Sequence, residues 1–210
     1  MVRLFIRTRT HEQLSGVDFD NHHEPPMAHP ESNTDNDWIL PGWGWFDDSG
    51  RSVQSDRVYY IPIYCASDLP IHGAKIDVTT GAAGTVARIG LYAGAIGSDG
   101  RVQIGALLAD WGTVSTASTG DVELVIDATL PQGYSFLTIG HQGGPSLRMP
   151  ADDALAVWPV TAGNTSYAAM RNAIPYADVG NGEDAFPNPH ATIDGVTSVI
   201  YAQVIIAPVG

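Results

Sequence analysis

Cysteine is almost absent from this sequence, because Cys65 is the only thiol among 210 residues. No disulfide can therefore form within the chain, which removes the main sign of a small secreted domain held together by disulfides. Cys65 ends the apolar segment 61–65, and in such a setting the thiol serves as a small apolar side chain. We expect a strand here and no catalytic cysteine.

Basic residues are also scarce. The chain has 10 Lys and Arg against 23 Asp and Glu, a formal net charge of −13, and Lys75 is its one lysine. Binding to nucleic acid depends on Lys and Arg that neutralise phosphates, and polybasic segments likewise attract proteins to anionic membranes. The acidity therefore excludes nucleic acid as an expected partner, and its ordinary explanation is solubility at high local concentration.

Long apolar runs are missing as well. No run approaches the 18 residues of a membrane-spanning helix, and residues 1–10 lack the apolar core and small-residue cleavage site of a signal peptide. We therefore expect no membrane insertion.

Turn residues are abundant, with 23 Gly and 14 Pro, as a fold of many short strands requires. From Arg57 onward, apolar and polar residues alternate with the period of two that β-strands produce. Across 86–92, for example, Ala87, Ile89 and Leu91 share one face, while Arg88 and Tyr92 share the other. We expect strands at 58–64, 75–79, 86–92, 106–109, 112–114, 122–126, 134–140 and 199–206, with one short helix at 166–172. This pattern predicts an antiparallel β-sandwich over residues 57–210.

Residues 1–56 have a different character, and we expect an extended N-terminal arm there. The stretch 11–37 is polar, acidic and rich in His and Pro, so it cannot bury enough surface to fold alone. It leads into an aromatic group that needs burial on the domain or on another subunit. We assign assembly and anchoring to this group, which consists of Trp38, Trp43, Trp45 and Phe46.

The run 78–92 resembles a module of tailed-bacteriophage virion proteins. The resemblance continues in order through Ala106-Leu107-Leu108-Ala109-Asp110-Trp111-Gly112-Thr113-Val114, Ser118-Thr119-Gly120 and Thr129-Leu130-Pro131-Gln132-Gly133-Tyr134-Ser135-Phe136-Leu137. It covers roughly 57–148 and fades beyond. Trp111 stands where the family usually has a small residue, and the arm has no counterpart in the module.

The resemblance implies a jelly-roll or carbohydrate-binding-like sandwich on a phage or phage-like particle, in a fibre, spike, tail tip or decoration role. It implies partners among other virion proteins and copies of the same chain, with a trimer favoured, and a glycan on the host surface as a further partner. The protein would then be found in the virion, assembled in the host cytoplasm. The family has no catalytic motif, so we expect no enzyme and no cofactor.

Exposed aromatic rings can stack on the apolar faces of sugars, although packing is the usual role of aromatic residues in a sandwich. The candidate ligand-binding residues are Tyr92, Trp111, Trp158, Tyr167 and Tyr176.

Two clusters could hold a metal ion, although a plain arm and a plain loop are the simpler interpretations. His22, His23 and His29, with Glu24 and Glu31, mix ligand types that suit zinc or nickel, but their spacing matches no structural zinc pattern. A second group could supply oxygen ligands to calcium without matching the EF-hand spacing. It consists of Asp178, Asn181, Glu183 and Asp184.

Enzymatic alternatives have weaker support. Acid pairs such as Glu123 with Asp127, Asp152 with Asp153 and Glu183 with Asp184 could be proposed for a glycosidase. His141 lies in a Gly-rich loop without any Gly-x-Ser-x-Gly motif. A host-attachment protein is therefore our first expectation. A capsid decoration or cement protein without a receptor comes second, and a polysaccharide depolymerase third.

Overall fold

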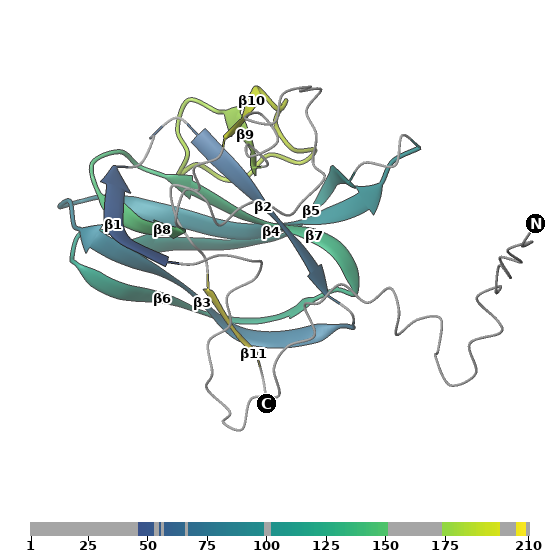
Figure 1. Ribbon diagram of the computed structural model, residues 1–210, viewed down its shortest axis with the longest axis horizontal. Helices are drawn as coiled ribbons and strands as arrows, with labels where there is room; N and C mark the ends of the chain where they lie inside the picture. The colour runs from purple at the N-terminus through teal and green to yellow at the C-terminus, as the bar shows by residue number, and fades with distance from the viewer. Residues whose placement is uncertain are drawn as a thin grey trace, which may run out of the picture.

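The computed structural model describes residues 46–52, 55, 57–65, 67–98, 102–150, 174–197 and 205–208. All regular structure in these residues is β, arranged as two antiparallel sheets that pack face to face as a β-sandwich (Figure 1). The strands are β1 (Phe46–Ser52), β2 (Arg57–Cys65), β3 (Leu69–Thr80), β4 (Val86–Ile96), β5 (Val102–Ser115), β6 (Gly120–Leu130), β7 (Gly133–His141), β8 (Ser146–Pro150), β9 (Ile174–Asp178), β10 (Gly195–Thr197) and β11 (Ile205–Pro208).

The five-stranded sheet is built around β3. One side of β3 pairs with β6 along most of its length, from Leu69 opposite Leu130 to Val78 opposite Gly120. Its other side is shared by two strands placed end to end, β11 and β8, and β1 pairs with the far side of β8. This order leaves β6 as an edge strand among the described residues.

The six-stranded sheet has the order β10-β9-β2-β7-β4-β5. Strand β2 pairs with β7 from Val58 to Cys65, whereas its contact with β9 is limited to 57–59. Pro62 therefore lies beyond the end of β9, where β2 has a single described neighbour and a missing N–H is tolerated. Pro62 thus lies in the half of β2 that is an edge among the described residues.

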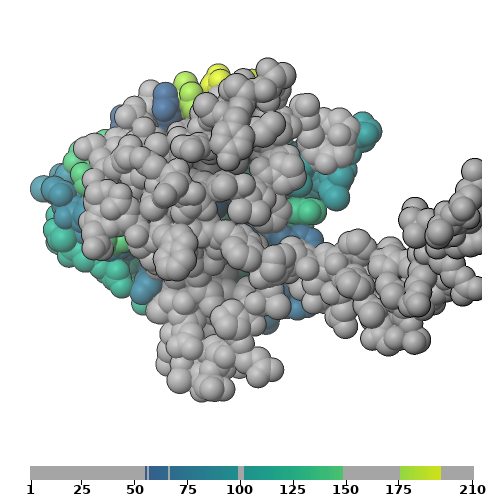
Figure 2. Space-filling view, viewed as in Figure 1, coloured from purple at the N-terminus to yellow at the C-terminus, as the bar shows by residue number. Residues whose placement is uncertain are grey.

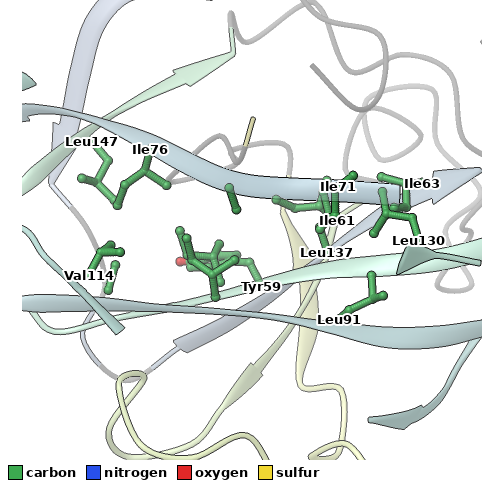
Figure 3. Packing of buried hydrophobic residues seen from close by; sticks show 14 of the residues in the cluster. Tyr59, Ile61, Ile63, Ile71, Ile76, Leu91, Val114, Leu130, Leu137 and Leu147 are labelled. Carbon is green, nitrogen blue, oxygen red and sulfur yellow. The ribbon is translucent and has the colours of Figure 1, made fainter. Parts of the chain in front are cut away.

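The main core lies between the sheets and consists of apolar side chains from β2 to β8. Ile71, Ile76 and Leu147 project from one sheet toward Leu137 and Leu91 of the other, and all five are essentially buried (Figure 3). Each such side chain contributes about 1.5–3 kcal/mol of transfer free energy. Burial of this alternating set is what fixes the register of the strands, because a slip by one residue would expose it.

The expected alternation of buried and exposed residues is confirmed in β4 and β6. Ala87, Ile89 and Leu91 join the main core, while Glu123 and Asp127 are exposed on β6. Cys65 is buried, as expected, and burial raises the pKa of its thiol.

Several boundaries differ from expectation. The segments 106–109 and 112–114 belong to one long strand, β5, because bulges interrupt the alternation without ending the strand. The sandwich also takes in residues before Arg57, since β1 pairs with β8. The expected strand at 199–206 is described only from Ile205, and the expected helix at 166–172 lies outside the described residues.

Candidate functional site

The outer face of the six-stranded sheet is covered by residues 179–194, which we call the covering layer and which lie at the top of the view in Figure 2. A second apolar cluster forms beneath it, with Val58 and Tyr60 from β2, Tyr92 from β4 and Phe136 from β7 meeting Phe186 of the layer. These rings are buried, and burial raises the pKa of the Tyr60 hydroxyl to about 12. The sheet therefore has apolar packing on both faces.

Tyr92 belongs to this covered face. Its side chain is fully buried, and its hydroxyl donates a hydrogen bond to the Pro187 carbonyl. Its ring also lies 5.4 Å from that of Tyr60 in an edge-on arrangement. Tyr92 thus lacks the exposed ring face that stacking on a sugar requires, and it attaches the covering layer to β4.

Asp110 on β5 connects the covering layer to the edge of the sheet. Its two carboxylate oxygens accept hydrogen bonds from Arg88 Nε at 2.8 and 2.9 Å. They also accept from the backbone N–H groups of Gly112 and Phe186, each at 3.2 Å. Arg88 in turn donates to the Glu183 carbonyl at 3.2 Å. One carboxylate therefore holds β4, the bulged part of β5 and the covering layer together.

The bulge beside Asp110 determines the position of Trp111. Ile89 pairs with Gly112 and Gly90 with Asp110, so Trp111 is the extra residue of β5. Gly112 has φ +97°, a left-handed conformation that favours glycine. Trp111 is half-buried and packs against the main core.

Tyr176 on β9 is also half-buried, but other groups occupy its ring. The Arg57 guanidinium lies 4.2 Å from the ring centroid, and the Tyr59 ring lies 6.2 Å away. Arg57 also forms a salt bridge of 3.0 Å with Asp178. These contacts are typical of a packed surface cluster.

The remaining candidate residues lie outside what the structure describes. Strand β1 begins at Phe46, whose side chain is not described. The candidates outside the described residues are His22, His23, His29, Trp38, Trp43, Trp45, Trp158 and Tyr167.

Of the candidate calcium residues, Asp178 ends β9 and the other three follow it, and several of them make other contacts. Asp178 pairs with Arg57, and the Asn181 side chain donates to the Asp184 carboxylate at 3.2 Å. The Glu183 carbonyl accepts from Arg88. No group of three or more His, Cys, Asp or Glu gathers as a metal site within the described ranges.

His141 ends β7 with its side chain in the core. It is fully buried, and neither ring nitrogen has a hydrogen-bond partner among the described residues. Desolvation lowers its pKa to about 3. The imidazole is therefore neutral near pH 7 and closed off from any substrate in solvent.

Three loops meet at one end of the sandwich, at 81–85, 116–119 and 142–145. Ala82 donates to the Thr116 carbonyl at 3.1 Å, Thr116 to the Thr85 carbonyl at 2.9 Å, and Gln142 to the Val86 carbonyl at 3.0 Å. None of these loop residues carries a charged side chain. This neutral loop end was not anticipated from the sequence, although its Gly, Ala, Ser and Thr content was a visible signal.

Comparisons of the chain with protein-family models, curated proteins and solved structures find no match. Within the described part of the chain, no helix has the length and apolar character needed to cross a membrane.

Proposed function

We propose that this chain is a non-enzymatic structural protein of a phage or phage-like particle, in a fibre, spike or tail tip. It takes part in particle assembly and in attachment to the host surface, and its sandwich is a jelly roll. It is found in the virion, among other virion proteins and further copies of itself, after assembly in the host cytoplasm.

The order of the first eight strands carries the proposal. In one sheet these strands lie side by side in the order β1-β8-β3-β6, and in the other sheet their order is β2-β7-β4-β5. Successive strands thus alternate between the sheets, except that β4 and β5 pair within one sheet, and the later strands fold back between the earlier ones. An interleaved order of this kind is expected for two Greek keys, as in capsid and lectin jelly rolls, so it supports the proposed jelly roll.

The phage-like motifs fall on consecutive elements of this framework. The run 78–92 spans the end of β3, the turn and most of β4, while 106–114 lies within β5. The run 129–137 covers the turn from β6 into β7. Because a fold alone does not define a function, this match in order between motif and strand is what supports a virion role.

The distribution of charge supports a structural role over a catalytic one. Arg57, Lys75 and Arg88 pair with Asp178, Asp121 and Asp110 respectively, at 2.8–3.0 Å. Arg148 pairs with Asp77. These charged groups bridge neighbouring strands, whereas glycoside hydrolysis needs two carboxyl groups that face each other across a substrate.

For attachment, the half-buried Trp111 is the candidate that we favour among the described aromatic residues, and Trp158 and Tyr167 stay as further candidates. A glycan array tests this role with wild-type protein and Trp111→Ala. Val125→Ala is the control, because Val125 is an apolar residue of β6 that is 79% exposed. We expect host-glycan binding to fall in the first variant alone, and equal binding by all three proteins would remove Trp111 from the site.

A cement protein is the second candidate, and the neutral loop end favours it. Its loops carry no charged side chain and are held together by hydrogen bonds, and the core of a protein–protein interface is likewise depleted in charged residues.

The deciding experiment locates an epitope tag on purified particles by immunogold electron microscopy and compares adsorption with and without the chain. A tag at the tail or fibre, with adsorption lost on deletion, supports attachment. A tag on the head, with intact adsorption and reduced particle stability, favours cement. Absence of the tag from particles overturns both roles. Release of reducing sugar from host capsule by the purified chain would overturn the non-enzymatic assignment.

A further inference from the structure

Two edge strands lie on the same side of the sandwich. Strand β5 is the last strand of the six-stranded sheet, β6 is an edge of the other sheet, and the turn at 116–119 joins them. Each has one described strand neighbour, β4 for β5 and β3 for β6. Open edges invite pairing with another chain unless charge or irregularity prevents it.

The two edges differ sharply in charge. Strand β6 presents Asp121, Glu123 and Asp127 on its exposed face, and of these Asp121 pairs with Lys75 at 2.9 Å. Strand β5 has one ionisable residue in its 14, Asp110, and that carboxylate is committed to Arg88 and two backbone N–H groups. In a chain of net charge −13, β5 is therefore the one of these two edges where a second acidic copy meets less repulsion.

Apolar side chains are also exposed along β5. Leu108 is 48% exposed, Ala106 is exposed, and Trp111 is half-buried nearby. Leu91 pairs with Ala109 and Tyr92 with Leu107, so Leu108 is the extra residue of a second bulge. Such bulges redirect a side chain and shorten any ladder that the edge can form. Contact here would rest on side chains around Leu108 and a short stretch of backbone.

We propose that β5 meets β5 of a second copy of this chain in an antiparallel, two-fold contact centred on Leu108. Centring on Leu108 places Asp110 opposite Ala106 of the other copy, so no like charges face each other. The same arrangement of β6 about its exposed Val125 would place Glu123 opposite Asp127, which destabilises cross-strand pairing. The charge pattern thus selects β5 over β6, with self-complementarity as two-fold symmetry requires.

This inference adds a specific partner surface to the proposed function, but it is tested on the isolated full-length chain, so it can fail or hold independently of any particle. Sedimentation velocity over a concentration series compares wild type with Leu108→Glu and with the matched control Val125→Glu. We expect a wild-type dimer whose dissociation constant rises on the order of 100-fold in Leu108→Glu, because two glutamates would meet at the axis. Val125→Glu should leave the dimer unchanged.

Crosslinking provides a second readout that does not depend on tolerance of a charge. Cys65 is buried, so a cysteine introduced at 108 or 125 is the reactive thiol. Leu108→Cys should form a disulfide-linked dimer under mild oxidation, whereas Val125→Cys should stay monomeric on a non-reducing gel. A wild-type monomer, a trimer of the kind the phage resemblance implies, a dimer that both Glu variants weaken equally, or equal crosslinking at 108 and 125 would each overturn the β5 contact.

Discussion

Burial of His141 makes a specific prediction about stability and pH. Its folded pKa is lowered to about 3 by desolvation, against an unfolded value of 6.5. The unfolded state therefore binds a proton at a higher pH than the folded state, so acidification favours unfolding. The full stability is present above the unfolded pKa and is lost progressively as the pH falls from 6.5 toward 3.

The magnitude follows from the two pKa values. Between pH 7.5 and 5.0 the linkage relation gives a loss of about 2 kcal/mol, and the full loss below pH 3 approaches about 5 kcal/mol. In His141→Leu this contribution disappears. The variant should be at least as stable as wild type at pH 7.5, because it removes two buried nitrogens without described partners.

Urea unfolding of both proteins at pH 7.5 and 5.0, followed by circular dichroism, measures the effect. Other titrating groups affect both proteins alike, so the quantity of interest is the difference between their losses. The wild type should lose about 2 kcal/mol more than His141→Leu. Equal losses, or an imidazole that titrates near 6.5 by NMR in the folded protein, would refute the burial argument.

Three further predictions concern packing and reactivity. Asp110→Ala should lower the free energy of unfolding by about 2–3 kcal/mol and speed hydrogen exchange in the covering layer, because Arg88 and two N–H groups lose their acceptor. Gly140→Ala should destabilise far more than Gly105→Ala in thermal melts, because a Cβ at 140 would overlap a backbone carbonyl of the covering layer, whereas at 105 it meets the Ala93 methyl group at 3.2 Å. Cys65 should resist a thiol reagent in the folded protein and react fully in urea, and a prompt reaction without urea would contradict its burial.

Sequence alternation was a good guide wherever a strand has one buried face. Strand β6 is the clearest case, because Glu123 and Asp127 point to solvent while Leu124 and Ile126 pack against the core. Such positions follow from the pleat alone. The bulges of β5 could not be predicted in this way, since each extra residue reverses the alternation and makes one strand resemble two.

The burial of the outer face of the six-stranded sheet was not predicted from the sequence. Residues 179–194 have the Gly, Pro and Asn content of a surface loop, and nothing local indicates that they cover a sheet. The strands beneath the covering layer did carry a signal of this burial. The run 58–63 of β2 and the run 135–141 of β7 are buried without interruption, as in strands covered on both sides. Tyr92 was a candidate for sugar stacking because one face of β4 was expected to meet solvent.

The covering layer also limits which described surfaces the proposed attachment can use. With the outer face of the six-stranded sheet closed, the accessible described surfaces include the neutral loop end, the β5 side and the outer face of β6. The last of these presents Asp121, Glu123 and Asp127, which repel an anionic polysaccharide at physiological salt within about 8 Å. If the proposed attachment uses the outer face of β6, we therefore expect its receptor to be a neutral or cationic glycan or a protein. Binding to a purely anionic capsule polysaccharide that persists in Trp111→Ala would exclude both Trp111 and the outer face of β6 as the attachment site.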